Sequence, residues 1–342
     1  MKNVKLGVIG VGRIGKLHVE NLMSLPHAVV KTVSDIQVDH LKEWAATVGV
    51  ENITTNYRDI LDDKEIDAVL ICSPTNTHYE VIIEAAKAGK HIFCEKPISF
   101  SSEESKEALK IVEESGIKFQ VGFNRRFDAS LKKVHDTVKK GIIGDPHIVK
   151  ITSRDPDAPP ADYIKNSGGM FMDMSIHDFD MARFITGSEV TEVYVQSASL
   201  IDPVFTEYGD VDTAIISLKF ASGAIGVIDN SRKAVYGYDQ RVEVFGSKGS
   251  VAIENELPTT AVISTAEGVL KDNPKYFFLE RYREAYIVEL ACFIDSVAND
   301  APLVCSGNDG LQAEIIAAAA KKSMLTGEPV KIEHDKSFSR IG

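Results

Sequence analysis

The sequence predicts an α/β protein of two domains: a doubly wound parallel-sheet domain, then an α/β domain with a large, mostly antiparallel sheet that is open on one face. Three observations support this fold class. Short β-branched runs alternate with helical patterns over about the first 120 residues, a glycine-rich turn joins the first strand to the first helix, and strand-like runs then succeed one another from Val190 to about Thr265. The 342 residues suffice for about two domains of ~150 residues each.

The elements of the first domain follow in regular order. Apolar runs without alternation are typical of parallel strands buried on both faces, and helices between them form βαβ units. The predicted strands cover residues 4–10, 28–35, 66–73, 91–97 and 117–123. The predicted helices cover residues 13–25, 38–48, 78–89 and 101–116, the last opening with serines and acidic residues that suit a helix N-terminus. We therefore expect a doubly wound domain over residues 1–122.

The pattern changes after Phe123. A helix is predicted over residues 128–140, a strand over 147–154, a proline-rich loop over 153–162 and a helix over 168–187, after a glycine pair. Six strand-like runs between residues 190 and 265, separated by turn signals, predict one largely antiparallel sheet. Helices over 280–298 and 310–325 follow, and residues 123–342 are expected to form the second domain, which binds the substrate and mediates oligomerisation.

The composition argues against several classes of protein. A formal net charge of −12 repels phosphate backbones and anionic lipids, so neither nucleic acid nor a membrane is expected as a partner. No apolar run reaches the ~20 residues that span a bilayer, and the N-terminus lacks the apolar core of a signal peptide. The four scattered cysteines contain no CxxC motif, which indicates small buried thiols in a reducing, cytoplasmic location.

The first turn of the chain predicts a dinucleotide site. Gly10, Gly12 and Gly15 form GVGRIG after a predicted strand and at the start of a predicted helix, which is the context that this motif requires. The first glycine permits the tight turn, the second lets the backbone approach a diphosphate, and the third lets helix and strand pack closely. Asp35 ends the second strand, where a carboxylate accepts hydrogen bonds from ribose hydroxyls and repels a 2′-phosphate, so the sequence favours NAD over NADP.

Other residues at the carboxyl edge of the sheet join this site. The SPTNTH segment after the third apolar strand is expected to contact ribose or nicotinamide, although some of its residues, Thr77 among them, can instead cap the next helix. The residues assigned to cofactor binding are Gly10, Gly12, Arg13, Ile14, Asp35, Ser73, Thr75, Asn76, His78, Glu95 and Lys96.

Two segments supply groups for alcohol oxidation, which needs a base for the hydroxyl proton and donors for the oxygens. Lys96 stands at the end of a strand, where the nicotinamide should lie and where a neighbouring cation would favour the neutral amine. In the helix over 168–187, Asp173, His177 and Asp180 stand at i, i+4 and i+7 and share one face. Histidine titrates near neutrality and suits a general base, and a carboxylate one turn away can orient it.

These candidates have simpler interpretations as well. Lys96 can be a solvated surface lysine, and the Asp173–His177 face can be a solvated helix face with a capped histidine. An inward-facing Asp/His pair also suggests a metal, but no third ligand has recognisable spacing, so no metal is expected.

Taken together, the motifs resemble one family over nearly the whole chain: the glucose–fructose oxidoreductase, inositol dehydrogenase and rhizopine-catabolism (Gfo/Idh/MocA) family. The matching motifs are GVGRIG, CEKP and GG-x3-D-x3-H-x2-D, and within the family VGFNRRFD, ITSRDPDAPP and YGYDQRVEVFGSKG are most similar to bacterial inositol 2-dehydrogenases. The resemblance implies a Rossmann domain joined to an open-faced α/β domain, with the substrate between them.

The resemblance also implies a catalytic trio: His177 as general base, Lys96 holding the reacting oxygen, and Asp173 binding hydroxyls and orienting the pair. It suggests Arg126, Asp155, Tyr236 and Tyr238 for the substrate pocket, although tyrosines are common in strands and Arg126 or Asp155 can be ion-paired scaffold residues. The implied reaction is the NAD-dependent oxidation of myo-inositol to 2-keto-myo-inositol, a step of inositol catabolism.

Three alternatives to this function remain open. The first is oxidation of scyllo- or chiro-inositol, and the second is oxidation of a pyranose such as glucose. The third is a non-catalytic NAD-binding sensor, against which the intact trio argues. Strands such as those over 213–220 and 223–231 place apolar residues on both sides, so the open sheet face is expected to be covered by self-association. The resemblance implies a homodimer or homotetramer.

Overall fold

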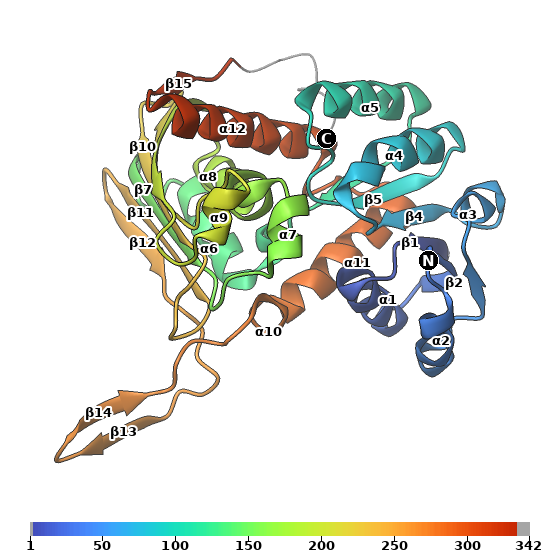
Figure 1. The fold of residues 1–342 in the computed structure, drawn as a ribbon, viewed down its shortest axis with the longest axis horizontal. Coiled ribbons are helices and arrows are strands. Elements are labelled where there is room, and N and C mark those ends of the chain that lie inside the picture. The colour runs from blue at the N-terminus through green and yellow to red at the C-terminus, as the bar shows by residue number, and fades with distance from the viewer. Residues whose placement is uncertain (1–2, 334–342) are drawn as a thin grey trace. The chain divides into compact units, whose positions relative to one another are not determined.

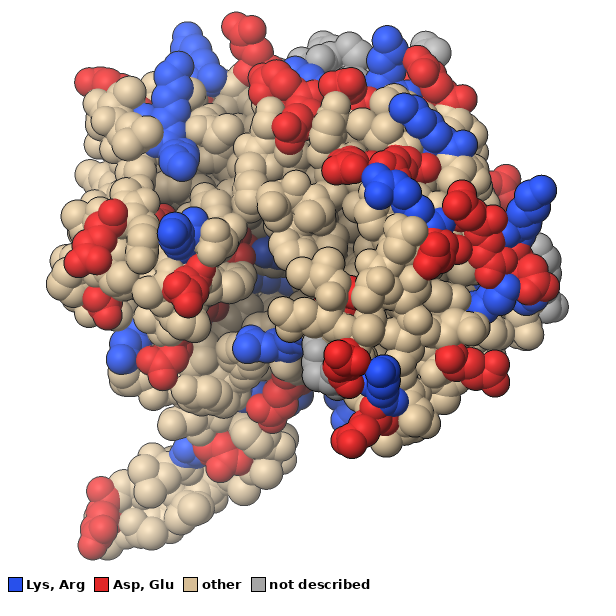
Figure 2. All heavy atoms as spheres, turned by 45° about the vertical axis from the view of Figure 1, so that its right-hand side comes forward, with Lys and Arg blue, Asp and Glu red and all other residues tan. Residues whose placement is uncertain are grey.

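The computed structural model describes residues 3–333, and their contacts divide the chain between two units. Unit 1 contains residues 3–127 and 284–314, and unit 2 contains residues 128–283 and 315–333. Within residues 3–333, no helix is both long enough and apolar enough to cross a lipid bilayer. Figure 2 shows acidic and basic side chains intermixed over the face in view.

Unit 1 is built on a six-stranded parallel sheet, which confirms the predicted doubly wound fold. The strand order is β3-β2-β1-β4-β5-β6, so the order reverses beside β1. The five predicted strands are present, and a three-residue strand that was not predicted adds the edge. The strands are β1 (Val4–Ile9), β2 (Ala28–Ser34), β3 (Asn52–Thr54), β4 (Ala68–Ile71), β5 (His91–Glu95) and β6 (Phe119–Gly122).

Helices cover both faces of this sheet. In Figure 1, α1 and α11 lie on one face, and α4 and α5 lie on the other. The helices of unit 1 are α1 (Arg13–Ser24), α2 (Lys42–Val48), α3 (Arg58–Asp62), α4 (His78–Lys87), α5 (Ser102–Ser115), α11 (Arg283–Asn299) and the first part of α12 (Gly307–Thr326). Short 3₁₀ helices cover Asp39–Leu41, Thr75–Thr77 and Asn124–Phe127.

The return of α11 to unit 1 departs from the predicted assignment of all residues after 122 to one domain. Leu290, Phe293 and Ile294 of α11 belong to the same buried core cluster as Val8 of β1 and Leu22 of α1. Burial of this apolar surface holds the helix on the first sheet. The helical periodicity of residues 280–298 predicts a buried face but does not say which sheet buries it.

Unit 2 is built on a seven-stranded sheet in the order β12-β11-β7-β10-β9-β8-β15. Only β7 and β10 pair in parallel, so the predicted mostly antiparallel sheet is confirmed. The strands are β7 (Pro146–Arg154), β8 (Val190–Ala198), β9 (Thr213–Phe220), β10 (Ile225–Ser231), β11 (Asp239–Gly246), β12 (Gly249–Ile253) and β15 (Val330–Lys331).

The last predicted strand of the series does not join this sheet. Instead β13 (Val262–Thr265) and β14 (Gly268–Lys271) form a separate two-stranded hairpin (Figure 1) in which every residue is exposed. An apolar run predicts an extended strand but not its partner. The helices of unit 2 are α6 (Ala129–Lys139), α7 (Ala161–Asn166), the π-helical turn Phe171–Ser175, α8 (Ile176–Thr186), α9 (Val204–Glu207), α10 (Phe278–Arg281) and the remainder of α12.

The helices of unit 2 cover only one face of its sheet. Figure 1 shows the other face without a helix over it, within the described residues. On this outer face, Ile215, Ile225 and Phe245 are exposed large apolar residues. The charged residues of the face pair with one another, as Lys150 does with Glu243 across neighbouring strands. The predicted open face is therefore present, with isolated apolar side chains between neutralised charges.

Candidate active site

The glycine turn after β1 is closed by backbone contacts that exclude side chains. Gly10 has φ of +87°, and a Cβ added there would lie 2.4 Å from the backbone nitrogen of Ser73. A Cβ added at Gly15 would lie 2.0 Å from the carbonyl oxygen of Gly10. These two glycines are therefore required for the turn to pack against α1 and the end of β4.

Gly12 has a different environment, which fits a diphosphate. No atom lies within 4 Å of a Cβ added at this position, so the space beside the backbone is open. Gly12 is also the N-cap of α1, and this glycine has no side chain to accept a capping hydrogen bond from the first turn of the helix. Arg13 is exposed and Ile14 is half-buried at this helix start. Free backbone N–H groups at the positive end of a helix dipole bind anionic groups, so the turn fits the diphosphate of a dinucleotide.

Asp35 lies where the sequence predicts the ribose contact. It follows β2, and its carboxylate accepts hydrogen bonds from the backbone N–H of Val11 at 2.8 Å and of Gln37 at 3.0 Å. These bonds tie the carboxylate to the glycine turn. A carboxylate has about four lone-pair sites, so two backbone bonds leave capacity for ribose hydroxyls.

The loop after β4 contains both exposed and buried members of the predicted cofactor set. The Ser73 and Thr77 hydroxyls are 2.6 Å apart, Thr75 is half-buried and Asn76 is exposed. His78, by contrast, is buried, and its Nδ1 and Nε2 atoms each lie 2.8 Å from a backbone carbonyl oxygen, those of Pro97 and Ser73. Both ring nitrogens thus face backbone oxygens, which places His78 between two loops and not among groups open to a cofactor.

Glu95 is the last residue of β5 and Lys96 follows it, but their side chains have different surroundings. The Glu95 carboxylate lies 2.7 Å from Nε2 of His18, a fully buried residue of α1. Glu95 is therefore linked to the helix that follows the glycine turn, an internal contact for a residue predicted to bind the cofactor. Lys96 follows it, is half-buried and precedes the cis peptide bond to Pro97.

In unit 2, the helix predicted over 168–187 is interrupted. Phe171–Ser175 form a π-helical turn that contains Asp173, and α8 with His177 follows. A π-turn contains one residue more than an α-turn, so the segment that carries Asp173 and His177 is not the regular α-helix that the sequence predicts. His177 is half-buried, whereas Asp180, expected on the same face, is completely buried. Single π-turns inside helices occur frequently at functional sites.

Asp173 belongs to a hydrogen-bonded cluster that the sequence did not reveal in full. Nη2 of Arg232 donates to Asp173 at 2.9 Å, and Nη1 of the same guanidinium donates to Asp155 at 3.1 Å. The second oxygen of Asp173 accepts from the Tyr163 hydroxyl at 2.8 Å. The structure thus brings together two predicted residues, Asp155 and Asp173, through two that were not predicted, Arg232 and Tyr163.

The charges of this cluster stabilise one another. Burial alone would lower the pKa of the Arg232 guanidinium, but Asp173 and Asp155 outweigh burial and raise that pKa above its ordinary value. Burial of the hydroxyl, together with the Asp173 carboxylate, raises the pKa of Tyr163. Arg232 is therefore a permanent cation, and Tyr163 is a neutral hydrogen-bond donor at neutral pH.

Two further predicted pocket residues have contacts within their own units. In unit 1, Arg126 donates to the carbonyl of Val304 at 3.0 Å and pairs with Asp309 at 2.9 Å, contacts typical of a scaffold residue. In unit 2, the ring of Tyr238 is buried and packs edge-on against Tyr282, with centroids 6.0 Å apart.

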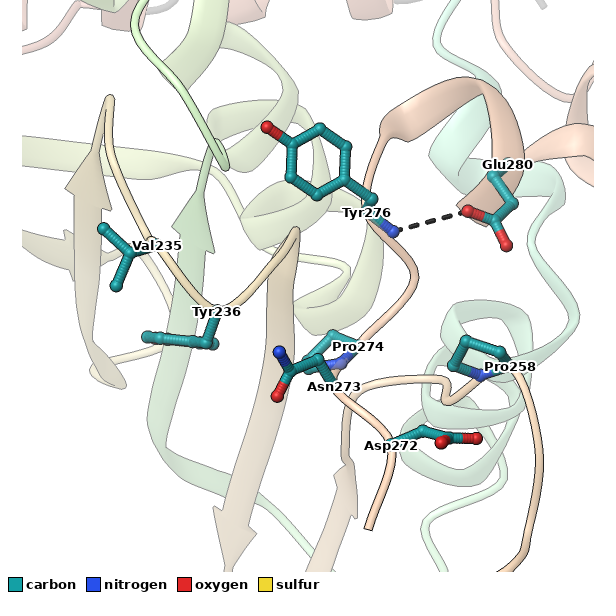
Figure 3. A pocket seen from close by; sticks show the side chains of 8 residues that line it. All are labelled: Val235, Tyr236, Pro258, Asp272, Asn273, Pro274, Tyr276 and Glu280. Carbon is teal, nitrogen blue, oxygen red and sulfur yellow. Dashed lines mark hydrogen bonds between the residues drawn. The ribbon is translucent and has the colours of Figure 1, made fainter.

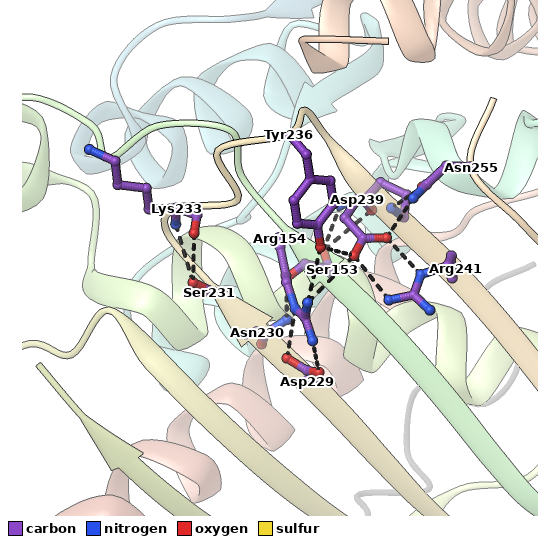
Figure 4. Close-up of polar contacts among 11 residues, drawn as sticks. Ser153, Arg154, Asp229, Asn230, Ser231, Lys233, Tyr236, Asp239, Arg241 and Asn255 are labelled. Atoms are coloured by element: carbon purple, nitrogen blue, oxygen red, sulfur yellow. Dashed lines mark hydrogen bonds and ion pairs between the residues drawn. The ribbon is translucent and has the colours of Figure 1, made fainter. Parts of the chain in front are cut away.

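Tyr236 has a different set of partners. Its hydroxyl donates to the buried Asp239 at 2.6 Å and accepts from Arg154 at 3.0 Å (Figure 4). Asp239 also binds Arg241 and Asn255, so a polar network holds the segment between β10 and β11 (Figure 4). The hydroxyl thus lies in this network and not beside Asp173.

Tyr236 also lines a surface pocket with a cavity volume of about 510 Å³ near the base of the hairpin (Figure 3). Its lining residues are Val235, Tyr236, Pro258, Asp272, Asn273, Pro274, Tyr276 and Glu280. Neither Asp173 nor His177 lines it, so we do not assign the chemistry to this pocket. Within residues 3–333, no group of three or more His, Cys, Asp or Glu side chains is arranged to hold a metal ion.

Two family models match the chain. The model described as "Oxidoreductase family, NAD-binding Rossmann fold" matches residues 4–123, and the GFO/IDH/MocA C-terminal domain model matches residues 131–252. The chain is 56% identical over 99% of its length to the uncharacterized oxidoreductase YrbE of Bacillus subtilis, of which 99% is covered. It is 48% identical to the myo-inositol 2-dehydrogenase of Thermotoga maritima, with 96% of this chain and 99% of the relative covered.

The fold also matches a solved structure with bound ligands. The scyllo-inositol dehydrogenase of Lactobacillus casei, crystallised with NAD(H) and scyllo-inositol, superposes with a TM-score of 0.91 at 31% identity, covering 96% of this chain and 99% of that one. The cofactor predicted from the glycine turn and Asp35, NAD, is confirmed by these comparisons.

Proposed function

Because the chain belongs to the GFO/IDH/MocA family of NAD-dependent oxidoreductases, we propose that it oxidises myo-inositol to 2-keto-myo-inositol. The observation that carries this proposal is the Asp155–Arg232–Asp173–Tyr163 cluster, in which Asp173 belongs to the π-helical turn just before His177. Two carboxylates and one guanidinium leave this cluster with a small net negative charge. Such a surface suits an uncharged substrate with many hydroxyls, because each buried hydroxyl needs a polar partner.

The residues that would hold NAD lie in unit 1. The backbone at Gly12 and the first turn of α1 would bind the diphosphate, and Asp35 would bind the adenosine ribose. NAD supplies, when bound, the acceptor for the hydride that leaves the oxidised carbon.

Three side chains would act on the substrate hydroxyl. His177 takes the hydroxyl proton as general base, since a neutral imidazole nitrogen accepts protons near pH 7. Lys96 holds the reacting oxygen by donating a hydrogen bond to it. Asp173 binds substrate hydroxyls through the carboxylate lone pairs that are not used by Tyr163 and Arg232. The hydrogen bonds from these two partners fix the orientation of the carboxylate.

The direct test is NADH formation against a panel of inositol isomers and pyranoses, with NAD and NADP in parallel. We expect turnover of myo-inositol with NAD. Turnover of a pyranose, without activity on any inositol isomer, would refute the substrate assignment.

The proposed general base is tested by His177→Ala. This variant should lose turnover by at least ~10²-fold while it retains NAD affinity in a calorimetric titration. Normal turnover in this variant would refute the assignment of His177 as the base.

A second candidate substrate is scyllo-inositol. It is favoured by the similarity to the Lactobacillus casei enzyme that was crystallised with this isomer. The two isomers differ only in the axial or equatorial orientation of one hydroxyl. The ratio of kcat/KM for the two substrates, measured on the same preparation, decides between them. A protein that binds NAD but oxidises no polyol would favour a sensor instead.

We also propose that a second copy of this chain covers the outer face of the unit 2 sheet, giving a dimer or a tetramer. The exposed Ile215, Ile225 and Phe245 support an interface on this face. Its charges are already paired within one copy, as in Arg154–Asp229 and Lys219–Glu192, so an identical face can pack on it without adding unpaired charges.

A further inference from the structure

Two buried titratable side chains from distant parts of unit 1 hold the three residues that follow Lys96. On one side, His78 of α4 contacts the carbonyl oxygen of Pro97 at 2.8 Å. On the other side, Glu314 of α12 accepts hydrogen bonds from the backbone N–H of Ile98 at 2.6 Å and of Ser99 at 3.4 Å. Glu314 is 216 residues away from Ile98 in sequence.

The Glu314 contact is enclosed by close packing. Its second carboxyl oxygen lies 2.6 Å from the Ser105 hydroxyl of α5, and Glu314, Ile98 and Ser105 are all buried. One turn earlier in α12, a Cβ added at Gly310 would lie 2.8 Å from the side chain of Ile98. The helix backbone therefore approaches this segment closely, and burying a carboxyl group there is tolerated only because both of its oxygens have partners.

His78 makes a similar connection on the opposite side. Its other ring nitrogen lies 2.8 Å from the carbonyl oxygen of Ser73, in the loop whose backbone touches Gly10 of the glycine turn. One imidazole thus joins the segment after Lys96 to the loop of the cofactor site. A carbonyl oxygen only accepts hydrogen bonds, and burial lowers the pKa of His78, so the neutral ring donates its single N–H to one of the two carbonyl oxygens and packs against the other.

The residue before Lys96 is fixed as well. Glu95 pairs with Gly122 in the sheet, and its carboxylate binds His18. The backbone of Lys96 is therefore held on both sides. Positioning of a reacting group depends on such supports, because a displacement of about 1 Å can reduce the rate by ~10²-fold.

We propose that His78 and Glu314 are positioning residues that clamp Pro97–Ser99 and thereby place the Lys96 amine for reaction. The part of this proposal that concerns turnover rests on the proposed function, in which Lys96 holds the reacting oxygen. His78 then acts through backbone contacts rather than as the cofactor ligand predicted from sequence.

The test compares Glu314→Ala and His78→Ala with two controls. Glu314→Gln keeps an acceptor for the two N–H groups and an amide that donates to Ser105, so it should preserve the clamp. Ile82→Ala truncates a buried residue of the same helix as His78 that lies outside the clamp, and reports general destabilisation. In both clamp variants, we expect kcat to fall ~10- to 10²-fold with KM for inositol and NAD affinity within ~3-fold of wild type. Glu314→Gln and Ile82→Ala should retain kcat.

Two measurements test whether the clamp holds Pro97–Ser99 without depending on enzymatic turnover. In Glu314→Ala, hydrogen–deuterium exchange of the peptide containing Ile98 and Ser99 should accelerate at least ~10-fold, because the backbone N–H groups of these two residues lose the carboxylate that accepts their hydrogen bonds. The rate at which an amine-acylating reagent modifies Lys96, followed by mass spectrometry, should change in both clamp variants and not in Ile82→Ala. Unchanged exchange and unchanged Lys96 reactivity would overturn the proposal, as would normal kcat in both variants. If the wild type oxidises no polyol, the proposed function fails, and these two measurements still decide whether the clamp exists.

Discussion

Removing the Arg232 guanidinium should destabilise unit 2 in a pH-dependent way. Arg232→Met preserves most of the side-chain volume but leaves Asp173 and Asp155 without the cation that both bind. Arg232 is only 4% exposed, and removing one partner of a buried ion pair typically costs 3–5 kcal/mol. The Asp155 side chain is 25% exposed and regains some hydration, so we expect a loss near the lower limit, about 3 kcal/mol.

The pH dependence follows from the two uncompensated carboxylates. In the variant, protonation of one carboxyl group relieves their repulsion, so the folded state binds more protons than the unfolded state above about pH 4. Stability of the variant should therefore fall as pH rises, and its deficit relative to wild type should be larger at pH 8 than at pH 5. For a unit of this size, a loss of about 3 kcal/mol corresponds to a decrease in Tm of about 6–12 °C.

The assay is thermal and urea unfolding of wild type and variant at both pH values. Arg183→Met is the matched control, because it removes an arginine of the same unit whose partner, Glu189, is 40% exposed. That control should lose only about 1 kcal/mol, with little pH dependence. The assignment of Arg232 as the charge that holds the two carboxylates together would be refuted by either of two results. One is a loss of unfolding free energy in Arg232→Met below 1 kcal/mol, and the other is a loss that is equal at pH 5 and pH 8.

Three further predictions concern other parts of the chain. Gly15→Ala places a Cβ 2.0 Å from the Gly10 carbonyl oxygen and should weaken NAD binding at least ~10-fold by calorimetry; unchanged affinity would contradict the closed turn. Burial raises the pKa of Glu314 to about 8 from an ordinary 4.5, so its carboxyl group destabilises the fold increasingly as pH rises through this interval. Glu314→Gln should consequently gain stability relative to wild type between pH 5 and pH 9, by up to about 4 kcal/mol at about 1.4 kcal/mol for each pH unit up to pH 8, and parallel stability curves would disprove this account. Phe245→Glu places a charge on the outer sheet face, where Phe245 is 47% exposed, and should shift the sedimentation coefficient to that of a monomer; an unchanged oligomer would exclude this face as the interface.

The residues that sequence reasoning found are those whose chemistry is local. The glycine turn and Asp35 follow directly from strand–turn–helix patterning, since each acts through its own backbone position. Lys96 and His177 could be proposed as site residues because strand ends and helix faces can be assigned without knowing the packing. The π-turn before His177 was not predicted, because its extra residue has no periodic signature.

The residues that sequence reasoning missed depend on which elements become neighbours. Arg232, which was missed, lies beside the predicted Asp155 because each follows a strand, and the last residues of those strands, Ser231 and Arg154, are paired in the parallel register of β10 and β7. That pairing was not predictable, because strand order within a mixed sheet is not encoded in the periodicity of single strands. The contact of Glu314 with Ile98 was even less predictable, because these two residues are 216 positions apart in the chain.

The return of α11 to the first sheet also determines when that sheet can be completed. Its residues Leu290, Phe293 and Ile294 close a core whose other members lie within the first hundred residues of the chain. A ribosome has therefore made all of residues 128–283 before α11 becomes available to unit 1. Until then, the nascent parallel sheet exposes an apolar face, which makes it a natural substrate for chaperones. A fragment cut after residue 127 should for the same reason aggregate instead of folding as an independent cofactor-binding domain.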